Sequence, residues 1–301
     1  MSSLIEKAAQ RLEQLRQAGV DIPATPRVAP VVETSVVEAS ARPVPEVHGV
    51  TSSRCVEIDL KALAAAGIVS PNAPRSQIAD QFRVIKRPLI SNAMGKGASV
   101  IVNGNLIMVT SALAGEGKSF TAINLALSIA TELDNTVMLV DADVARPCIL
   151  EMLGLPSSPG LLDILGDESN ELSNMLLKTN IDKLSILPSG TPHARATELL
   201  ASDAMTRLLA DMASRYSDRI IIFDSPPLLL TTEARVLASH MGQIVMVVRA
   251  EKTLQSDVRH ALTTIESCPV KLMVLNQAST VAKGGYGYGY DYGLGYGQQI
   301  A

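Results

Sequence analysis

Continuous apolar runs alternate with helical patterns along most of this chain. Runs rich in Val, Ile, Leu and Met predict strands that are buried on both faces, as in a parallel sheet. These runs lie at residues 106–112, 137–143, 184–190, 219–227, 243–250 and 270–276. Helical spacing of apolar residues marks residues 58–67, 76–90, 118–133 and 197–216. The alternation predicts an α/β fold with a doubly wound, mainly parallel sheet.

The two ends of the chain lack this alternation. Apolar residues on one face predict an N-terminal helix over residues 1–19, either a surface helix or a docking helix for a partner. Residues 20–57 are proline-rich without a helical period, so we expect a disordered linker there. We place the globular domain at residues 58–280. Residues 281–301 form a predicted flexible Gly-Tyr tail, because glycine keeps the backbone loose.

Composition and charge narrow the function classes. The chain has 301 residues, of which 47% are apolar, and this is enough for one large core or two small ones. A net charge of −4 speaks against a nucleic-acid partner. The N-terminus lacks the apolar core of a signal peptide, and no run reaches the roughly 18 apolar residues of a membrane helix. Together with three scattered cysteines that fit no zinc or redox spacing, this predicts a cytoplasmic protein.

The stretch SALAGEGKS, Ser111–Ser119, follows a predicted strand and opens a predicted helix. A phosphate-binding loop requires that context, so the stretch predicts an α/β fold of the phosphate-loop NTPase type. Its glycines let backbone N–H groups wrap an anion, and the helix N-terminus adds positive potential. The residues assigned to the nucleotide are Ala114, Gly115, Glu116, Gly117, Lys118, Ser119 and Phe120. The usual pattern begins with Gly where this chain has Ala112, which leaves the wrap around GEGK intact.

Two later motifs place carboxylates at the carboxyl ends of predicted strands, where ligands collect in open α/β sheets. VMLVDAD ends in Asp141 and Asp143, and RIIIFDSPP contains Asp224. Taken alone, each aspartate is a helix cap or a turn residue. Together they would repel a triphosphate unless a divalent metal intervened, so we expect Mg²⁺ with ligands Ser119, Asp141 and Asp224. Lys118 is expected to reach the β- and γ-phosphates.

These motifs in combination resemble those of the bacterial tyrosine kinases, which use a phosphate-loop fold. The resemblance rests on GEGKS (115–119), LVDAD (139–143), IIIFDSPP (220–227) and the tyrosine-rich tail, and it covers about residues 75–301. Three shorter stretches resemble lesser landmark motifs of the family: GLLDIL (160–165), PSG (188–190) and TELL (197–200). The separate chain with its N-terminal helix resembles the subgroup found with exopolysaccharide and exosortase systems.

The resemblance implies an ATP- and Mg²⁺-dependent protein-tyrosine kinase that phosphorylates its own tail on a neighbouring copy. Asp141 is then the candidate base for the phenol proton, with Asp143 assisting. Lys118 stabilises the transferring phosphoryl group. The expected phosphoacceptors are Tyr286, Tyr288, Tyr290, Tyr292 and Tyr296. Asn276, at a strand end, is assigned to adenine, with a plain strand-end cap as the alternative.

Two departures from the family pattern concern basic residues. The family's DxDxR motif has its arginine where this chain has Ala145, and Arg146 is the candidate replacement. The family's ExxRxxR helix motif, which contacts the next subunit in a ring, stands here as DxxRxxK with Asp80, Arg83 and Lys86. We expect a ring-like homo-oligomer, with an ordinary solvated helix face as the alternative.

The chain also resembles the separate-chain arrangement of the family. In that arrangement, the cytoplasmic tail of a membrane polysaccharide chain-length determinant, or co-polymerase, activates the kinase. This implies peripheral recruitment to the inner face of the plasma membrane and a role in regulating exopolysaccharide synthesis and export.

The main alternative is a partition or septum-site ATPase, a switch without kinase activity that shares the loop and both aspartate motifs. Those ATPases carry an extra lysine early in the loop, where this chain has Leu113. A regulator that only senses nucleotide is a second alternative, and the intact loop and aspartates argue against it.

Overall fold

The computed structural model describes residues 54–71, 76–167, 169–215 and 219–278. The chain divides into two units, Met1–Gly49 and Val50–Ala301, and all described residues belong to the second. The predicted N-terminal helix, most of the predicted linker and all five tail tyrosines therefore lie outside the described residues. Those expectations stay predictions.

The described residues build one sheet of eight strands. The strands are β1 (Cys55–Val56), β2 (Leu106–Ser111), β3 (Thr136–Asp141), β4 (Leu177–Thr179), β5 (Leu184–Leu187), β6 (Arg219–Asp224), β7 (Gln243–Arg249) and β8 (Val270–Asn276). They lie in the order β1-β4-β5-β3-β6-β2-β7-β8, and every neighbouring pair is parallel except β4 with β5. The predicted doubly wound, mainly parallel sheet is confirmed.

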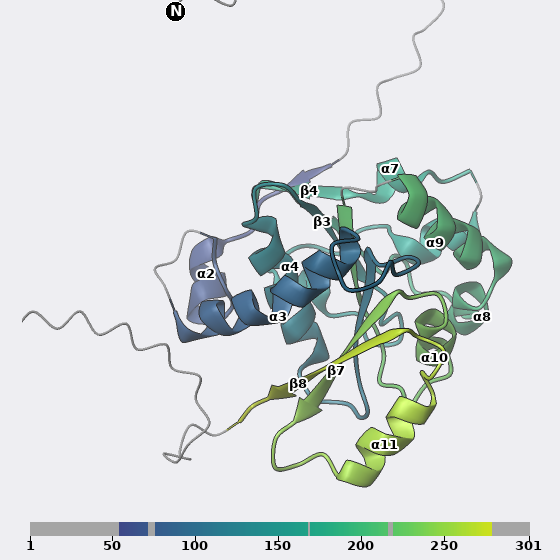
Figure 1. The fold of residues 1–301 in the computed structure, drawn as a ribbon. Helices are drawn as coiled ribbons and strands as arrows, with labels where there is room; N and C mark the ends of the chain where they lie inside the picture. Colours follow the sequence, from purple (N-terminus) through teal and green to yellow (C-terminus); the bar gives the residue numbers. More distant parts are fainter. Residues whose placement is uncertain (1–53, 72–75, 168, 216–218, 279–301) are drawn as a thin grey trace, which may run out of the picture. The chain divides into compact units, whose positions relative to one another are not determined.

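Helices cover both faces of this sheet (Figure 1). They are α2 (Leu60–Ala65), α3 (Gln77–Ala93), α4 (Lys118–Ala130), α5 (Ile149–Met152), α6 (Leu161–Gly166), α7 (Leu172–Met175), α8 (Ala196–Leu200), α9 (Asp203–Arg215), α10 (Glu233–Ala238) and α11 (Gln255–Thr263). One apolar layer joins the sheet to α2, α3 and α4, and the other joins it to α8, α9 and α10. Within the described ranges, no helix is both long and apolar enough to cross a membrane.

Each central strand divides its side chains between these two layers. Ile107 and Val109 pack with α4, whereas Met108 packs with α9. Because both faces are covered, all six residues of β2 are buried, which explains its continuous apolar run. The predicted double burial is wrong for β8, where exposed and partly buried residues alternate. β8 is an edge strand, and Met273 and Leu275 are exposed on one of its faces.

The globular domain begins earlier than predicted. Cys55 and Val56, which we assigned to the linker, form β1 and pair with β4. The side chain of Asn180 holds the segment that follows, because the Ile58 N–H donates to Asn180 Oδ1 at 2.9 Å and Asn180 Nδ2 donates to the Ile58 carbonyl at 3.0 Å. A two-residue strand has no periodic pattern, so only these distant partners fix it.

The single helix predicted over residues 197–216 is two helices, α8 and α9. Ser202 separates them, since its hydroxyl accepts from the Met205 N–H at 3.3 Å and so caps α9. The same hydroxyl donates to the Leu199 carbonyl at 2.7 Å, at the end of α8. Apolar periodicity runs across the break because both helices pack on the same layer.

The predicted helix from Ser76 continues past Pro88. The Ser76 hydroxyl caps α3 by accepting from the Ala79 N–H at 3.2 Å, and the helix runs to Ala93. Proline has no N–H for the carbonyl of Val84, four residues earlier. Val84 is largely exposed, so water can bond that carbonyl instead.

A glycine contact joins the landmark motifs GLLDIL and PSG. A Cβ added to Gly160 would lie 2.0 Å from the carbonyl oxygen of Pro188. The Leu161 N–H donates to that oxygen at 2.8 Å. Asp163 Oδ2 accepts from the Gly160 N–H at 2.8 Å and from the Thr191 N–H at 3.0 Å. These residues hold the loop before α6 against the loop after β5.

We predict that Gly160→Ala lowers the free energy of unfolding by at least about 2 kcal/mol, because the new methyl group meets backbone that cannot rotate away. Gly166→Ala is the matched control, since a Cβ there meets nothing within 4 Å. The control should change stability by less than about 1 kcal/mol. Urea unfolding of both variants measures the difference, and equal stabilities would contradict the glycine contact.

Candidate active site

The predicted phosphate loop lies between β2 and α4, as the sequence indicated. Gly115 and Gly117 have φ of 79° and 91°, a left-handed conformation that glycine adopts without strain. Gly117 is the N-cap of α4 and offers no side chain to its first N–H groups. The amides of the loop and of the helix start are therefore left for an anion, which the helix dipole also favours.

Lys118 is the first residue of α4, and its ammonium pairs with a strand-end carboxylate. Lys118 Nζ lies 2.7 Å from Asp143 Oδ2, and both side chains are mostly buried. Burial opposes the charge on Lys118, but the carboxylates of Asp224 and Asp143 outweigh it and raise the pKa of the ammonium. Lys118 therefore stays charged in the site, as a phosphate ligand must.

Asp141 and Asp224 end neighbouring strands in direct register, β3 against β6. Asp141 Oδ2 accepts from the Cys148 and Ile149 N–H groups, each at 3.1 Å. Its Oδ1 and both carboxylate oxygens of Asp224 are buried without a hydrogen-bond partner among the described residues. Burial raises the pKa of Asp224 to about 7 and that of Asp141 to about 6, the latter partly offset by the Ile149 N–H.

Buried carboxylate oxygens without a partner suit a bound cation, since buried polar atoms in proteins are otherwise paired. Ser119 follows Lys118 in the first turn of α4, and its hydroxyl acts to lower the pKa of Asp224. A hydroxyl with one or two carboxylates fits Mg²⁺, which completes its shell with waters and substrate phosphates. In the described part of the chain, no three Cys, His, Asp or Glu side chains converge as a metal cage. The residues present therefore fit a metal held jointly with a nucleotide.

Glu116 has a role in the loop that sequence reasoning missed. Its side chain is buried, Oε2 accepts from the Leu113 N–H at 2.8 Å, and Oε1 accepts from the Thr253 hydroxyl. Thr253 also accepts from the Arg249 N–H at 3.2 Å. The carboxylate thus ties the phosphate loop to the loop between β7 and α11. The only sequence signal was an acidic residue inside an anion-binding loop, which needs a local partner to be tolerated.

Asn276 supports the loop from the end of β8. Its Nδ2 donates to the Glu116 carbonyl at 2.9 Å. A Cβ on Gly117 would lie 2.1 Å from that nitrogen, so only glycine fits there. This contact agrees with the structural alternative for Asn276, and a contact with adenine stays a prediction. Of the other predicted loop residues, Ala114 is exposed and Phe120 is half-buried.

Arg146 lies beside the site and contacts Asp143 through its backbone. Its backbone N–H donates to the Asp143 carbonyl at 3.0 Å and to Asp143 Oδ1 at 3.2 Å, and its side chain is exposed. The backbone thus helps to orient Asp143. A catalytic role for the guanidinium stays a prediction.

The predicted oligomer contact is wrong for Lys86. Its ammonium is buried against the end of α4, where it donates to the Ser128 carbonyl and to Thr131 Oγ1 and pairs with Glu132 Oε1 at 2.8 Å. Lysine at the C-terminus of a helix neutralises its last carbonyls. Asp80 and Arg83 remain on the exposed side of α3, where they pair with each other.

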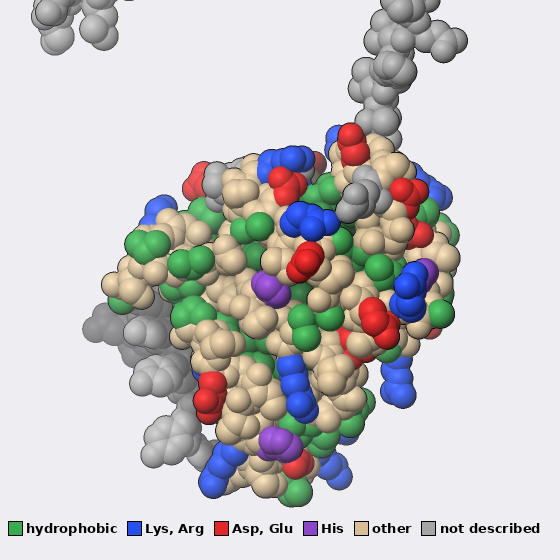
Figure 2. Space-filling model, turned by 90° about the vertical axis from the view of Figure 1, so that its right-hand side faces the viewer, with side chains coloured by type: hydrophobic (Ala, Val, Ile, Leu, Met, Phe, Trp, Pro, Cys, Tyr) green, Lys and Arg blue, Asp and Glu red, His purple; other side chains and the backbone are tan. Residues whose placement is uncertain are grey.

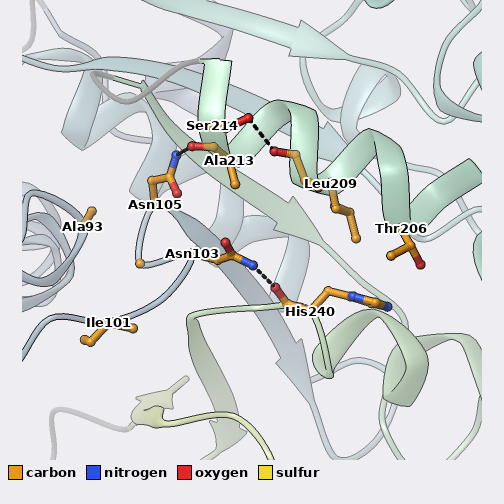
Figure 3. A pocket seen from close by; sticks show the side chains of 11 residues that line it. Ala93, Ile101, Asn103, Asn105, Thr206, Leu209, Ala213, Ser214 and His240 are labelled. Atoms are coloured by element: carbon orange, nitrogen blue, oxygen red, sulfur yellow. Dashed lines mark hydrogen bonds between the residues drawn. The ribbon is translucent and has the colours of Figure 1, made fainter. Parts of the chain in front are cut away.

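A separate hollow of about 520 Å³ lies at the amino end of β2, away from the phosphate loop (Figure 3). Its amides are already engaged, since Asn103 Nδ2 donates to the His240 carbonyl and Asn105 Nδ2 donates to the Ala213 carbonyl, each at 3.2 Å. These bonds fasten α9 and the start of β7 to the sheet. The hollow therefore belongs to packing and not to the nucleotide site.

The fold and this site together define a phosphate-loop NTPase. Residues 103–284 match the family described as "ParA: NUBPL iron-transfer P-loop NTPase". The tyrosine-protein kinase YwqD of Bacillus subtilis (strain 168) is 30% identical over 222 residues, which cover 73% of this chain and 90% of that protein. The chain therefore belongs to the bacterial tyrosine-protein kinases and carries a ParA-type NTPase domain, and nucleotide binding comes with that family.

Two further relatives agree with this assignment. The tyrosine-protein kinase wzc of Salmonella typhi is 30% identical over 62% of this chain, but the match spans only 26% of that longer protein. The crystal structure of the chimerical protein CapA2B2 superposes with a TM-score of 0.58 at 27% identity, covering 72% of this chain and 92% of that one.

We predict that Glu116→Ala weakens nucleotide binding about tenfold, because the Leu113 N–H and the Thr253 hydroxyl lose their buried acceptor. Thr253→Val, which removes one of the two bonds, should have a smaller effect. Glu57→Ala changes an exposed glutamate far along the chain and serves as control. Calorimetric titration with a non-hydrolysable ATP analogue gives the affinities, and a Glu116→Ala value within twofold of the parent would refute the role of Glu116.

We also predict that Asp224→Asn stabilises the nucleotide-free protein at alkaline pH. The folded-state pKa of about 7 exceeds the ordinary value of 3.8, so the folded state holds the proton more tightly. The proton on Asp224 therefore contributes stability that is fully present below pH 3.8 and is lost as the pH rises through about 7. At pH 8 the variant should gain up to about 4 kcal/mol, and the gain should shrink towards pH 5.

Thermal unfolding without nucleotide at both pH values measures this gain. Asp182→Asn, at an exposed aspartate, controls for the loss of one negative charge. Parallel pH profiles for the two variants would contradict the burial cost assigned to Asp224.

Proposed function

We propose that this chain is an ATP- and Mg²⁺-dependent protein-tyrosine autokinase that transfers phosphate to the tail tyrosines of a neighbouring copy. The observation that carries the proposal is the set of orphaned carboxylate oxygens on Asp141 and Asp224 beside the charged Lys118. Such a set matches the needs of a metal-bound triphosphate. Membership of the tyrosine-kinase family and the tyrosine-rich tail support a phenol as the acceptor.

Each group has a distinct part in this reaction. The phosphate-loop amides and Lys118 hold the β- and γ-phosphates, and Ser119, Asp141 and Asp224 are the proposed Mg²⁺ ligands. When bound, Mg²⁺ neutralises charge on the phosphates. The phenol oxygen forms a bond to the γ-phosphorus while the bond from that phosphorus to the β,γ-bridging oxygen breaks, and ADP leaves. Asp141 accepts the phenol proton through its unpartnered Oδ1.

The position of the last strand lets the tail reach an active site, in its own copy or in a neighbour's. The described chain leaves the sheet through β8, whereas Asp141 ends β3. Three strands separate β8 from β3, so the two lie about 19 Å apart at ~4.8 Å per strand. Taken as a flexible coil, the 18-residue stretch from Gly284 onward would have a root-mean-square span of about 23 Å, which covers that distance.

The proposal extends to assembly and partner. We propose that Asp80 and Arg83, which are exposed on α3, contact the next subunit in a ring-like homo-oligomer. A membrane polysaccharide co-polymerase is the proposed activator, which would recruit the chain to the inner face of the membrane and link it to exopolysaccharide export.

An ATPase switch without kinase activity remains the competing function. The loop position that holds an extra lysine in partition ATPases is Leu113, a partly buried side chain packed against the core. On the face shown in Figure 2, basic side chains lie singly among acidic ones. That face therefore lacks the basic surface on which a DNA-bound switch depends.

We predict that the full chain with Mg-ATP becomes phosphorylated on its C-terminal peptide, as measured by mass spectrometry. Lys118→Ala should reduce the rate at least about a hundredfold, because an electrostatic contact to the transferring group is lost. Asp141→Asn should reduce it about a hundredfold or more, because the base is lost. Lys61→Ala, at an exposed lysine of α2, is the matched control.

An experiment that mixes two variants distinguishes transfer between copies from transfer within one copy. A chain ending at Ala282 supplies the active site, and full-length Lys118→Ala supplies the tail. Phosphotyrosine on the Lys118→Ala tail supports transfer between copies. Steady ATP hydrolysis by the full chain without phosphotyrosine would instead establish the switch.

A further inference from the structure

A groove opens beside Asp141 on the side away from the phosphate loop. It has a volume of about 680 Å³ and runs between α5, the loop before α6 and the loop after β5. We call it the Asp141 groove, and the argument uses six of its lining residues: Asp141, Pro147, Glu151, Pro156, Ser157 and Pro192. All of them except Asp141 are exposed, so the groove is open to another chain.

The position of Asp141 makes this groove the approach to the reaction. On one side Asp141 lies in register with Asp224, at the end of the neighbouring strand β6. On the other side it lines the groove. Its Oδ1 is buried and has no partner among the described residues. Because Asp141 lines the groove, a phenol lying there is beside the carboxylate that we propose as the base.

The chemistry of the walls suits an uncharged aromatic side chain. Proline rings from three separate segments line the groove and give a phenol ring apolar surface to bury against. Among the described lining residues none is Lys or Arg, whereas Asp141 and Glu151 are acidic. Arg54 Nη1 donates to Ser158 Oγ, in the wall of the groove, at 3.4 Å. The groove therefore lacks lining cations that would hold a phosphate or a carboxylate.

We propose that the Asp141 groove is the acceptor subsite and that it selects tyrosines with uncharged neighbours. This inference rests on the proposed kinase function. Tyr286, Tyr288 and Tyr296 have glycine on both sides, whereas Tyr290 and Tyr292 flank Asp291. The acidic groove repels Asp291, so the glycine-flanked tyrosines react first.

The same repulsion makes the reaction self-limiting. Each new phosphate adds about −1.5 to −2 charge next to the remaining tyrosines. An acceptor with a phosphorylated neighbour then enters the acidic groove less readily, and the product finds no lining cation to retain it. Phosphorylation of the tail thus slows with each transfer and the product leaves the groove.

Single-tyrosine tails test the selectivity. Full chains retain only Tyr288 or only Tyr290, with the other four tail tyrosines changed to Phe. At low salt with Mg-ATP, the Tyr288 chain should be phosphorylated about threefold faster, a modest ratio because exposed charges are screened. Asp291→Asn in the Tyr290 chain, or Glu151→Gln in the catalytic chain, should bring the two rates together, as should 0.5 M salt.

Blocking the groove tests its location. Ser157→Trp places a large ring on an exposed wall residue, and Ser239→Trp is the matched control at an exposed serine before β7, at the other end of the sheet. Ser157→Trp should lower tail phosphorylation at least tenfold, while thermal unfolding and affinity for an ATP analogue show that both variants are folded. The control should react at the parent rate.

The outcomes separate the two proposals. If no tail tyrosine of the parent chain is phosphorylated, the kinase function fails. If the parent is phosphorylated but Ser157→Trp reacts as fast as Ser239→Trp, the acceptor subsite is wrong. If Ser157→Trp is slow but Asp291→Asn leaves the ratio of Tyr288 to Tyr290 unchanged, the charge selectivity is wrong.

Discussion

The carboxylates at the ends of β3 and β6 impose the constraint on which this site depends. Asp141 and Asp224 sit side by side in a parallel register, with Asp143 two residues further along the chain. Lys118 donates to the Asp143 carboxylate at 2.7 Å and so brings a positive charge to this group of aspartates. Burying carboxylates without full compensation is costly, and their raised pKa values express that cost. The protein thus holds a charge arrangement that becomes favourable once a metal-bound nucleotide is present.

Holding such an arrangement requires a rigid frame, and the fold supplies it at three places. The sheet fixes the aspartates through strand register. The loop that carries Lys118 is fixed by Glu116, which reaches the loop between β7 and α11, and by Asn276 from β8. Lys86 ties α3 to the far end of the same helix α4. The segments of the proposed nucleotide site are therefore anchored to elements on both sides of the loop, which is how a site is kept in a binding conformation before the ligand arrives.

The sequence predicted the parts of this structure that leave a local signal. Continuous apolar runs predicted the buried strands, and the GEGKS loop and the two aspartate motifs predicted which residues meet at the site. What failed depends on distant contacts. β1 exists because β4 and Asn180 are present, and Lys86 points inward because the end of α4 lies opposite it. Glu116 resembles an ordinary loop residue until Thr253, 137 positions away, is brought beside it.

In the proposed reaction, the uncompensated negative charge at the metal side and the acidic groove at the acceptor side have one cause and opposite consequences. A nucleotide brings its own cation to the carboxylates, so negative side chains there aid binding. An acceptor peptide brings none, and the same negative field favours a neutral phenol over a charged neighbour or product. Glycine suits both needs, because it adds no charge and lets the backbone bend so that successive tyrosines can approach Asp141. The composition of the tail and the composition of the groove are therefore two sides of one electrostatic requirement.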